Sequence, residues 1–215
     1  AQLHREGERV EIFSRTLDPV ANRFPEVRDA LLQLGHDVIF DGEIVAYSQT
    51  DGRCLQFQAL QKRLGRKTVS AEIMQKVPVA CMVFDLLFLD GEVLLEAPMS
   101  RRKELLVGLD LPYPLVHAPT VLFPIASIGQ ADQERRGAGA SAHNGVIGAS
   151  PTILSPLRQA TLTGESALDI MFDAARERGN EGLMVKMPGS TYSPGKRGKA
   201  WLKVKRALAT LDVVV

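Results

Sequence analysis

Apolar and polar residues follow two different periods along this chain, and these predict strands and helices in mixed order. Residues 9–14 alternate between apolar and polar side chains, which is the pattern of a half-buried strand. Residues 79–89 form an almost uninterrupted apolar run before Asp90-Gly91, which predicts a buried strand followed by a turn. By the same criteria, strands are predicted over residues 9–14, 38–47, 79–89, 182–187 and 201–206.

Four other segments space their apolar residues at helical intervals. Pro25 suits the first turn of a helix, and Gly35 ends the pattern that follows it. Ser100 is expected to cap a later helix, and Gly179 to end the last one. The predicted helices cover residues 25–34, 56–64, 100–109 and 166–178. This mixed order, with short turns between several neighbouring strands, predicts an α+β domain on largely antiparallel sheets.

Residues 127–156 differ in composition from the rest of the chain. Glycine, alanine and serine dominate this stretch, and its apolar residues show no period. We therefore interpret most of it as a flexible surface insertion. The chain as a whole has 215 residues and is 45% hydrophobic, which suffices for one substantial domain with its own core.

The charge of the chain is unevenly distributed. The net charge is only +1, so the total gives little reason to expect nucleic acid as a partner. Residues 181–206, however, contain seven basic side chains against one acidic side chain, which creates a local positive field. Cys54 and Cys81 stand alone and predict neither a thiolate zinc site nor a disulfide framework. No apolar run approaches the ~18 residues of a membrane span, so we expect an intracellular, cytoplasmic protein without a membrane partner.

Two lysines on the last predicted strand are the first candidates for chemistry. Alternation places Lys203 and Lys205 on one face, roughly 7 Å apart along the strand. Like charges this close are tolerated either on a solvated face or where an anion such as a phosphate lies between them. The cationic turn at residues 194–199 makes the anion interpretation about as probable as the solvated one.

The sequence Asp41-Gly42-Glu43 lies within a predicted strand. A glycine inside a strand suggests that a ligand or a second backbone approaches closely at that point. Carboxylates on a rigid strand suit Mg²⁺, which takes one or two protein carboxylates beside substrate phosphates. The alternative interpretation is an Asp-Gly turn between two short strands.

Other polar or aromatic positions allow two interpretations each. Phe84 in a buried strand is more often part of a hydrophobic core than a platform for a base. Asp85, in the buried strand, needs a partner and should pair with an arginine or accept backbone N–H bonds. Glu181 and Lys186 lie at opposite ends of one predicted strand, and a regular strand would point them to opposite faces. Charged residues at the ends of strands are usually solvated, which is the alternative to a role in a site.

Taken in order, these segments resemble the adenylation domain of ATP-dependent DNA ligases, in the covalent nucleotidyltransferase superfamily. Each segment alone is weakly specific, but six in the family's order are highly specific. The resemblance implies a nucleotidyltransferase (ATP-grasp-like) fold with two largely antiparallel sheets flanked by helices. The matching segments are residues 12–15 (IFSR) with 24–27 (FPEV), 40–45 (FDGEIV), 57–63 (FQALQKR), 84–87 (FDLL), 181–186 (EGLMVK) and 201–205 (WLKVK).

The resemblance also implies roles for individual residues and the cofactors ATP and Mg²⁺ or Mn²⁺. Phe84 would stack on adenine, Arg15 would contact the ribose or phosphates, and basic residues would surround the phosphates. The implied catalytic residues are Glu181, Lys203 and Lys205. The implied metal ligands are Glu43 and Glu181. The implied ATP-binding residues are Arg15, Glu43, Phe84, Lys186, Arg197 and Lys203.

The sequence departs from the family pattern in one respect. The family's nucleophile is the lysine of a K-x-D-G motif, and no lysine of this chain is followed by x-Asp-Gly. The sequence therefore predicts that residues 1–208 are an adenylation domain that is incomplete at its N-terminus and does not adenylylate itself. Residues 209–215 resemble the first strand of the OB-fold domain that follows in the family.

The resemblance implies that the intact protein seals nicks in double-stranded DNA, as a monomer, through lysyl-AMP and DNA-adenylate intermediates. One alternative is RNA ligation or mRNA capping, in which the same scaffold acts on a different acceptor. The segments at residues 24–27 and 57–63 favour DNA ligase over these. Another alternative is a non-catalytic module that keeps only a basic nucleic-acid-binding face.

Overall fold

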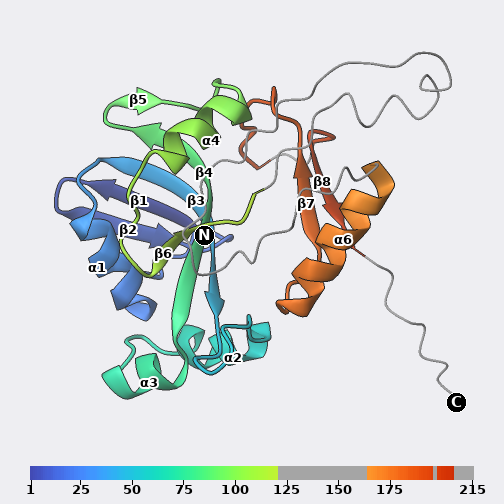
Figure 1. Ribbon diagram of the computed structural model, residues 1–215. Coiled ribbons are helices and arrows are strands. Elements are labelled where there is room, and N and C mark those ends of the chain that lie inside the picture. The colour runs from blue at the N-terminus through green and yellow to red at the C-terminus, as the bar shows by residue number, and fades with distance from the viewer. Residues whose placement is uncertain (121–163, 196–197, 206–215) are drawn as a thin grey trace, which may run out of the picture.

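The computed structural model describes residues 1–120, 164–195 and 198–205, with side chains from residue 168 onward in the second range. Two sheets with helices beside them form its framework (Figure 1). The interpretation of residues 127–156 as an insertion, the resemblance of residues 209–215 to an OB-fold strand, and Arg197 lie outside the described residues.

The larger sheet has six strands and confirms the predicted antiparallel character. Its neighbours along the path β2-β1-β3-β4-β5 are all antiparallel, and β6 pairs with β4 in parallel. Of these, β1 is not among the predicted strands, and neither are β5 and β6, which are too short for a periodic pattern. The strands are β1 (Gln2–Glu6), β2 (Arg9–Phe13), β3 (Val38–Ala46), β4 (Val79–Leu89), β5 (Glu92–Val93) and β6 (Leu115–His117).

The long β3–β4 pair contains the Asp-Gly-Glu sequence, and Gly42 lies well inside β3. A Cβ atom on Gly42 would lie 3.1 Å from the backbone oxygen of Met82 and 3.2 Å from Cys81 Sγ. The expected close approach is therefore that of a second backbone, and the alternative of an Asp-Gly turn is wrong. The pairing also shifts register between Asp41 and Gly42.

Burial alternates along β3 and separates the two faces of the larger sheet. Phe40, Gly42 and Ile44 are buried, whereas Asp41 is half-buried and Glu43 is exposed. Core residues occupy the first face, and the second, which we call the open face, carries both acidic side chains. The helices of this part of the chain are α1 (Pro25–Gln33), α2 (Phe57–Leu64) and α4 (Met99–Val107), with the short α3 (Ala71–Lys76) and a 3₁₀ turn at Ala21–Arg23.

A buried arginine explains why two of the family-like segments have their particular residues. The Arg63 side chain is fully buried, and its Nη1 lies 2.6 Å from Oε1 of Glu26. Its Nε also donates to the backbone oxygen of Val77 at 2.7 Å. Because a buried charge needs a partner, these contacts join α1 and α2 to the segment after α3. The roles of Glu26 and Arg63 are thus structural.

A second buried pair confirms the prediction for Asp85. Both carboxylate oxygens of Asp85 accept from Arg102, with distances of 2.8 Å from Nε and 3.0 Å from Nη2. The backbone N–H of Leu86 donates to the same carboxylate at 3.0 Å. Both predicted kinds of partner are therefore present, and the pair links β4 to α4.

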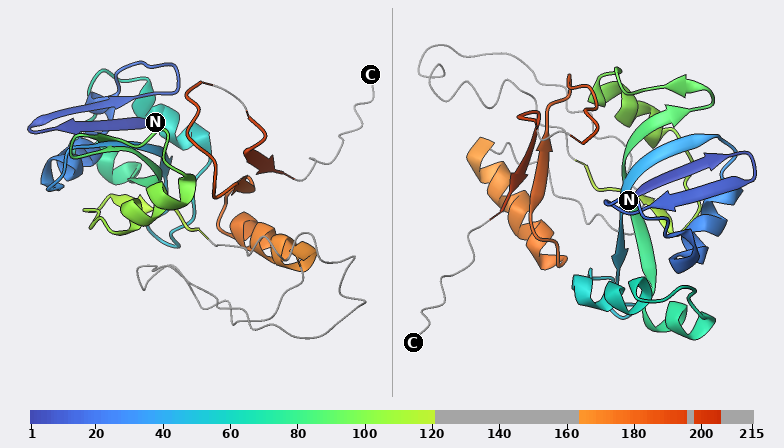
Figure 2. Two further views of the ribbon diagram at one scale, coloured as in Figure 1. Left: turned by 90° about the horizontal axis from the view of Figure 1, so that it is seen from above. Right: turned by 180° about the vertical axis from the view of Figure 1, so that it is seen from behind.

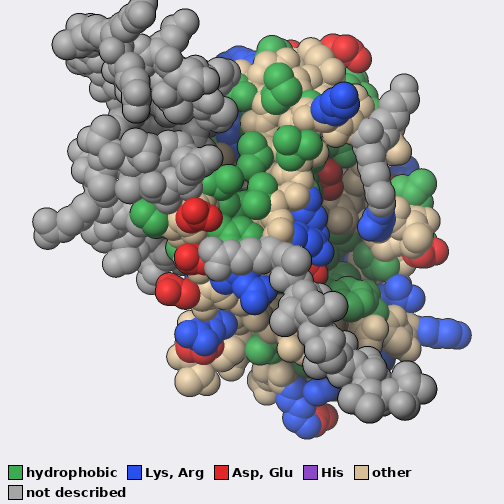
Figure 3. Space-filling view, turned by 90° about the vertical axis from the view of Figure 1, so that its right-hand side faces the viewer, with side chains coloured by type: hydrophobic (Ala, Val, Ile, Leu, Met, Phe, Trp, Pro, Cys, Tyr) green, Lys and Arg blue, Asp and Glu red, His purple; other side chains and the backbone are tan. Residues whose placement is uncertain are grey.

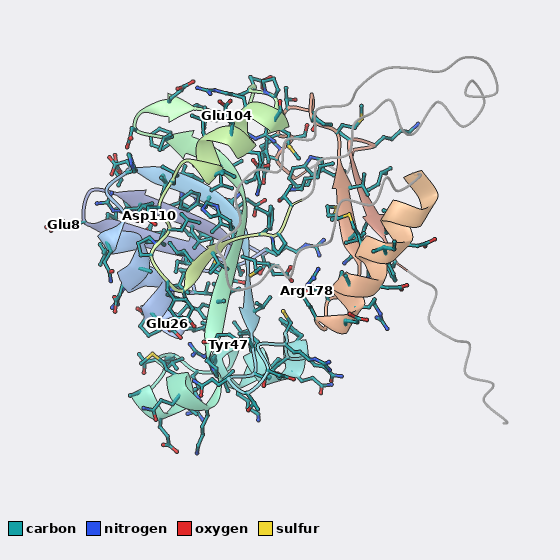
Figure 4. All side chains as sticks on the ribbon, in the orientation of Figure 1. Glu8, Glu26, Tyr47, Glu104, Asp110 and Arg178 are labelled. Carbon is teal, nitrogen blue, oxygen red and sulfur yellow. The ribbon has the colours of Figure 1, made fainter. Side chains whose placement is uncertain are left out.

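The smaller sheet pairs β7 (Leu183–Lys186) with β8 (Trp201–Val204) in antiparallel fashion. Helix α6 (Gly164–Glu177) lies on the far side of this pair from the larger sheet, as both Figure 1 and Figure 2 show. The Arg178 side chain, at the end of α6, lies between the helix and the larger sheet (Figure 4). The backbone oxygen of Arg178 accepts from the N–H of Cys54 at 3.2 Å, which connects the two parts of the fold.

The expectation that Ser100 caps its helix is wrong. Helix α4 begins at Met99, Pro98 occupies the N-cap position, and no side chain caps the helix. The free amides of the first turn bind backbone oxygens of a distant loop instead: Met99 donates to Ser190 and Ser100 to Pro188. Tertiary contacts can satisfy these amides as well as a local cap does.

Gly182 is expected to be indispensable to the β7–β8 pair. A Cβ atom at this position would lie 2.1 Å from the backbone oxygen of Val204 and 3.1 Å from the Phe172 ring. Gly182→Ala therefore forces the strands apart, and we expect the midpoint of thermal unfolding to fall by several degrees, corresponding to about 1–3 kcal/mol. Gly189→Ala is the control, because a Cβ at Gly189 meets nothing within 4 Å. Equal midpoints for the two variants would contradict this close packing.

Candidate active site

A lysine held between two aromatic rings marks the place where the two sheets meet. The Nζ atom of Lys186 lies 4.5 Å from the centroid of the Phe84 ring and 3.8 Å from that of Trp201. The two rings meet edge to face, with centroids 6.4 Å apart. Phe84 is half-buried on the open face, so it is available as a platform rather than enclosed in the core.

Burial lowers the pKa of Lys186 to about 8, and the charges of Asp85 and Asp41 act in the opposite direction. The side chain therefore keeps its positive charge at neutral pH. An ammonium ion over aromatic faces is stabilised by the ring quadrupoles, which compensates for part of its lost hydration. The chain thus places a cation that is only partly hydrated beside the aromatic platform.

Asp41 and Tyr192 form the polar side of this junction. The Tyr192 hydroxyl donates to Oδ2 of Asp41 at 3.0 Å, and the Tyr192 ring meets Trp201 edge to face at 6.0 Å. Burial raises the pKa of Asp41, and the hydrogen bond from Tyr192 offsets part of that rise. This contact joins β3 to the loop between β7 and β8.

An acidic side chain and two lysines gather at the opposite end of the β7–β8 pair. Lys203 Nζ and Lys205 Nζ lie 3.0 Å and 2.8 Å from the same oxygen, Oε2 of Glu181. These contacts lower the pKa of Glu181 to about 2. All three side chains are solvent-exposed, so salt screens the pairs and they add little to stability.

The residues to which the resemblance assigns one ATP site are therefore brought together only in part. Lys186 contacts Phe84, and Glu181 contacts both Lys203 and Lys205. Glu181 lies five positions before Lys186, and five extended residues span roughly 16 Å. Both groups belong to the same pair of strands.

Glu43 and Arg15 are separate from these groups. Glu43 is exposed on β3, two positions after Asp41 and opposite Met82, and no contact among the described residues joins it to Glu181. Arg15 is exposed in the turn after β2, where the neighbouring Thr16 donates to Asp18 Oδ2 at 2.5 Å. The structure therefore presents Glu43 on the open face and Arg15 in a rigid turn.

Sequence reasoning did not include several residues of the junction. Trp201 could have been found, because strand alternation places it on the same face as Lys203. Asp41 was considered only as a carboxylate suited to Mg²⁺, and not as the partner of Tyr192. Tyr192 and Arg102 carried no local signal, since their contacts lie 151 and 17 residues away in sequence.

The face of the molecule on the side of the smaller sheet combines charge with apolar surface. Lysine and arginine side chains gather near the middle of this face, with hydrophobic side chains beside them (Figure 3). The exposed hydrophobic residues of the smaller sheet and its flanks are Met184, Val185, Met187 and Leu202.

Neither a cluster of metal-ligating side chains nor a membrane-spanning helix occurs in the described part of the chain. Among residues 1–120, 164–195 and 198–205, no group of three or more histidine, cysteine, aspartate or glutamate side chains is placed to hold a metal ion. No helix in this described part has the length and apolar character needed to cross a membrane.

Comparison with known proteins agrees with the resemblance seen in the sequence. The family model described as "ATP dependent DNA ligase domain" matches residues 1–110 and 144–205. A probable DNA ligase of Koribacter versatilis is 41% identical over the whole chain, which spans 34% of that relative. A probable DNA ligase of Opitutus terrae is 43% identical over the whole chain, which spans 20% of it.

Solved structures confirm the predicted α+β nucleotidyltransferase fold. The crystal structure of the ligase domain from M. tuberculosis LigD covers 95% of this chain with a TM-score of 0.57 and 25% sequence identity. This chain covers 50% of that domain. The matched segments, the architecture and the similarity to named relatives agree, and the chain belongs to the ATP-dependent DNA ligase domain family.

Proposed function

We propose that this chain forms the nucleotide-binding core of an ATP-dependent DNA ligase, which joins 5′-phosphate and 3′-hydroxyl ends at nicks in duplex DNA. The observation that carries the proposal is that the β7–β8 pair presents Lys186 beside the Phe84 platform and, toward its other end, Lys203 and the adjoining Lys205. An aromatic face for a base and ammonium groups for phosphates are the two features that recognition of ATP requires.

In this proposal the nucleotide extends along the β7–β8 pair. The adenine stacks on Phe84, and the phosphates lie toward Lys203 and Lys205. Because the base and the Lys186 ammonium compete for the same ring, nucleotide binding moves Lys186 toward the phosphates. Lysines aimed at the phosphates neutralise the charge that develops at the α-phosphorus, which is the main requirement of nucleotidyl transfer.

We further propose that Glu43 and Glu181 hold Mg²⁺ together with the phosphates. The donor set fits this ion, because Mg²⁺ takes one or two carboxylates and obtains its other ligands from phosphates and water. The low pKa of Glu181, about 2, keeps its carboxylate ionised. When bound, the ion would add positive charge at the transferring phosphoryl group.

The covalent step implied by the resemblance needs the lysine of a K-x-D-G motif, which these 215 residues do not contain. Binding of ATP is therefore the step for which this chain's own residues can be tested. Joining is tested on a protein that combines this chain with that motif. We expect it to seal nicked DNA faster than substrates with RNA ends, and the reverse preference would favour RNA ligation.

ATP binding can be followed through Trp201, the single tryptophan of the chain. Titrating the 215-residue chain with ATP and Mg²⁺ should change the Trp201 emission to a saturable limit, because the ring contacts both Lys186 and Phe84. Inorganic triphosphate should bind more weakly, since it lacks a base. Phe84→Leu should weaken ATP binding roughly tenfold, as expected when about 1–3 kcal/mol of stacking is lost.

Phe57→Leu is the matched control, because Phe57 is 63% exposed on α2 and contacts neither Lys186 nor Trp201 among the described contacts. It should bind ATP as the unaltered chain does. Saturable binding that is equally weakened by the two substitutions would show that Phe84 is not the base platform. An emission that ATP leaves unchanged, with no binding by calorimetry, would contradict the proposed site itself.

A further inference from the structure

We propose that Tyr192 is a positioning residue that orients Trp201 and, through it, the Lys186 ammonium. The orientation of Trp201 by Tyr192 does not depend on the proposed function. Only the expected effect on ATP affinity rests on that function. Tyr192 lies in the loop between β7 and β8, between the family-like segments 181–186 and 201–205 and within the residues that the family model matches.

The backbone of this loop is bound to the larger part of the fold before it reaches Tyr192. The N–H of Ser100 donates to the oxygen of Pro188 at 2.9 Å, and the N–H of Met99 donates to that of Ser190 at 2.8 Å. The N–H of Tyr192 itself donates to the oxygen of Leu95 at 2.8 Å. These bonds hold residues 188–192 against the start of α4, so the position of the Tyr192 Cα is determined by the larger part of the fold.

The side chain of Tyr192 is then held on both sides. Its hydroxyl donates to Asp41 on β3 at 3.0 Å, and the Arg102 guanidinium lies 5.9 Å from its ring centroid. Arg102 is itself fully buried and paired with Asp85. Burial raises the pKa of Tyr192, so the hydroxyl remains a donor throughout the physiological range.

Trp201 receives its orientation from these contacts. Its ring meets Tyr192 at an interplanar angle of 77° on one side and Phe84 at 78° on the other. Trp201 is also the strand partner of Lys186, and its ring contacts the Lys186 ammonium. Loss of the Tyr192 hydroxyl releases the Tyr192 ring from Asp41. Trp201 then loses one of its two edge-to-face contacts, the one with Tyr192, and keeps the one with Phe84.

Tyr192→Phe tests this with little change in shape. In the nucleotide-free 215-residue chain, we expect the Trp201 emission to move to longer wavelength and its quenching by acrylamide to increase about twofold. We also expect the dissociation constant for ATP to rise about fivefold or more. Circular dichroism should remain that of the unaltered chain, because the backbone bonds to α4 are retained.

Tyr113→Phe is the matched control, since the Tyr113 hydroxyl contacts that of Tyr47 and no residue of the junction. It should leave both emission and ATP affinity unchanged. Asp41→Ala removes the acceptor instead of the donor and should reproduce the emission of Tyr192→Phe. Combining the two substitutions should add nothing further, because both break the same contact.

Emission and quenching of Tyr192→Phe equal to those of the unaltered chain would overturn the proposal. So would additive effects in the double variant, since the hydroxyl would then act independently of Asp41. If the unaltered chain fails to bind ATP, the proposed function is contradicted, while the nucleotide-free emission still decides the role of Tyr192. Should Tyr192→Phe fail to fold, Asp41→Ala alone must show the shifted emission, and an unshifted emission would refute the role.

Discussion

Arg102→Met is expected to lower the free energy of unfolding by about 3–5 kcal/mol, because it leaves a buried carboxylate without its partner. Arg102 is fully buried, and two of its nitrogens hold the two oxygens of Asp85 at 2.8 Å and 3.0 Å. Methionine fills much of the same volume, so the loss is one of charge pairing rather than of packing. Urea unfolding followed by circular dichroism measures the change.

Arg101→Met provides the matched control at the adjacent position. Arg101 is exposed and pairs with Glu104 at 2.9 Å on the surface of α4, a contact worth less than about 1 kcal/mol. Replacing both buried partners, as Asp85→Leu with Arg102→Met, should recover part of the loss because no charge is then left unpaired. Similar losses for the Arg101 and Arg102 variants would contradict the stabilising role of the buried pair.

Replacing both Lys203 and Lys205 by methionine is expected to raise the dissociation constant for ATP by about 100-fold or more, since two charge-assisted contacts of roughly 1.5–3 kcal/mol each are lost. Both side chains are about half exposed, so the effect should be largest at low ionic strength. The same variant should raise the pKa of Glu181 from about 2 toward its ordinary value, because the two ammonium groups are the main cause of the lowering. Calorimetry at two salt concentrations and an NMR titration of Glu181 test the two parts.

The control for charge is Lys67→Met with Lys76→Met, which removes the same net charge from exposed positions at the ends of α2 and α3. It should leave both ATP affinity and the pKa of Glu181 unchanged. An equal loss of affinity in this control would mean that the overall charge of the chain, and not the pair of lysines, attracts ATP. If the Lys203/Lys205 variant bound ATP like the unaltered chain, Glu181 and these two lysines would not form the phosphate site.

Patterns with a local physical cause predicted much of the fold. The apolar run gave the bounds of β4 correctly, since the half-buried face of this strand also carries mostly apolar side chains. The glycine within β3 predicted a close backbone approach, and Gly42 makes one. The need of a buried carboxylate for a partner predicted the pairing of Asp85. Short elements such as β5 and α3 have too few residues to show a period.

The candidate site was predicted less completely. Strand alternation placed Lys203 and Lys205 on one side, and both contact Glu181. Alternation could not show that Lys186 lies between two aromatic rings, because those rings come from different sheets. Glu43 and Glu181 were expected to lie together as metal ligands. Glu43 lies on β3, and no contact among the described residues joins it to Glu181.

The sequence by itself determined the family, the antiparallel α+β architecture and the strand that carries the paired lysines. Only the tertiary structure decided that Glu26 and Arg63 serve packing, that loop carbonyls bind the first turn of α4, and that Tyr192 reaches Asp41. The reason is physical: periodicity records which face of an element is apolar, a property of neighbouring residues. The distance between two distant side chains depends instead on how whole elements pack.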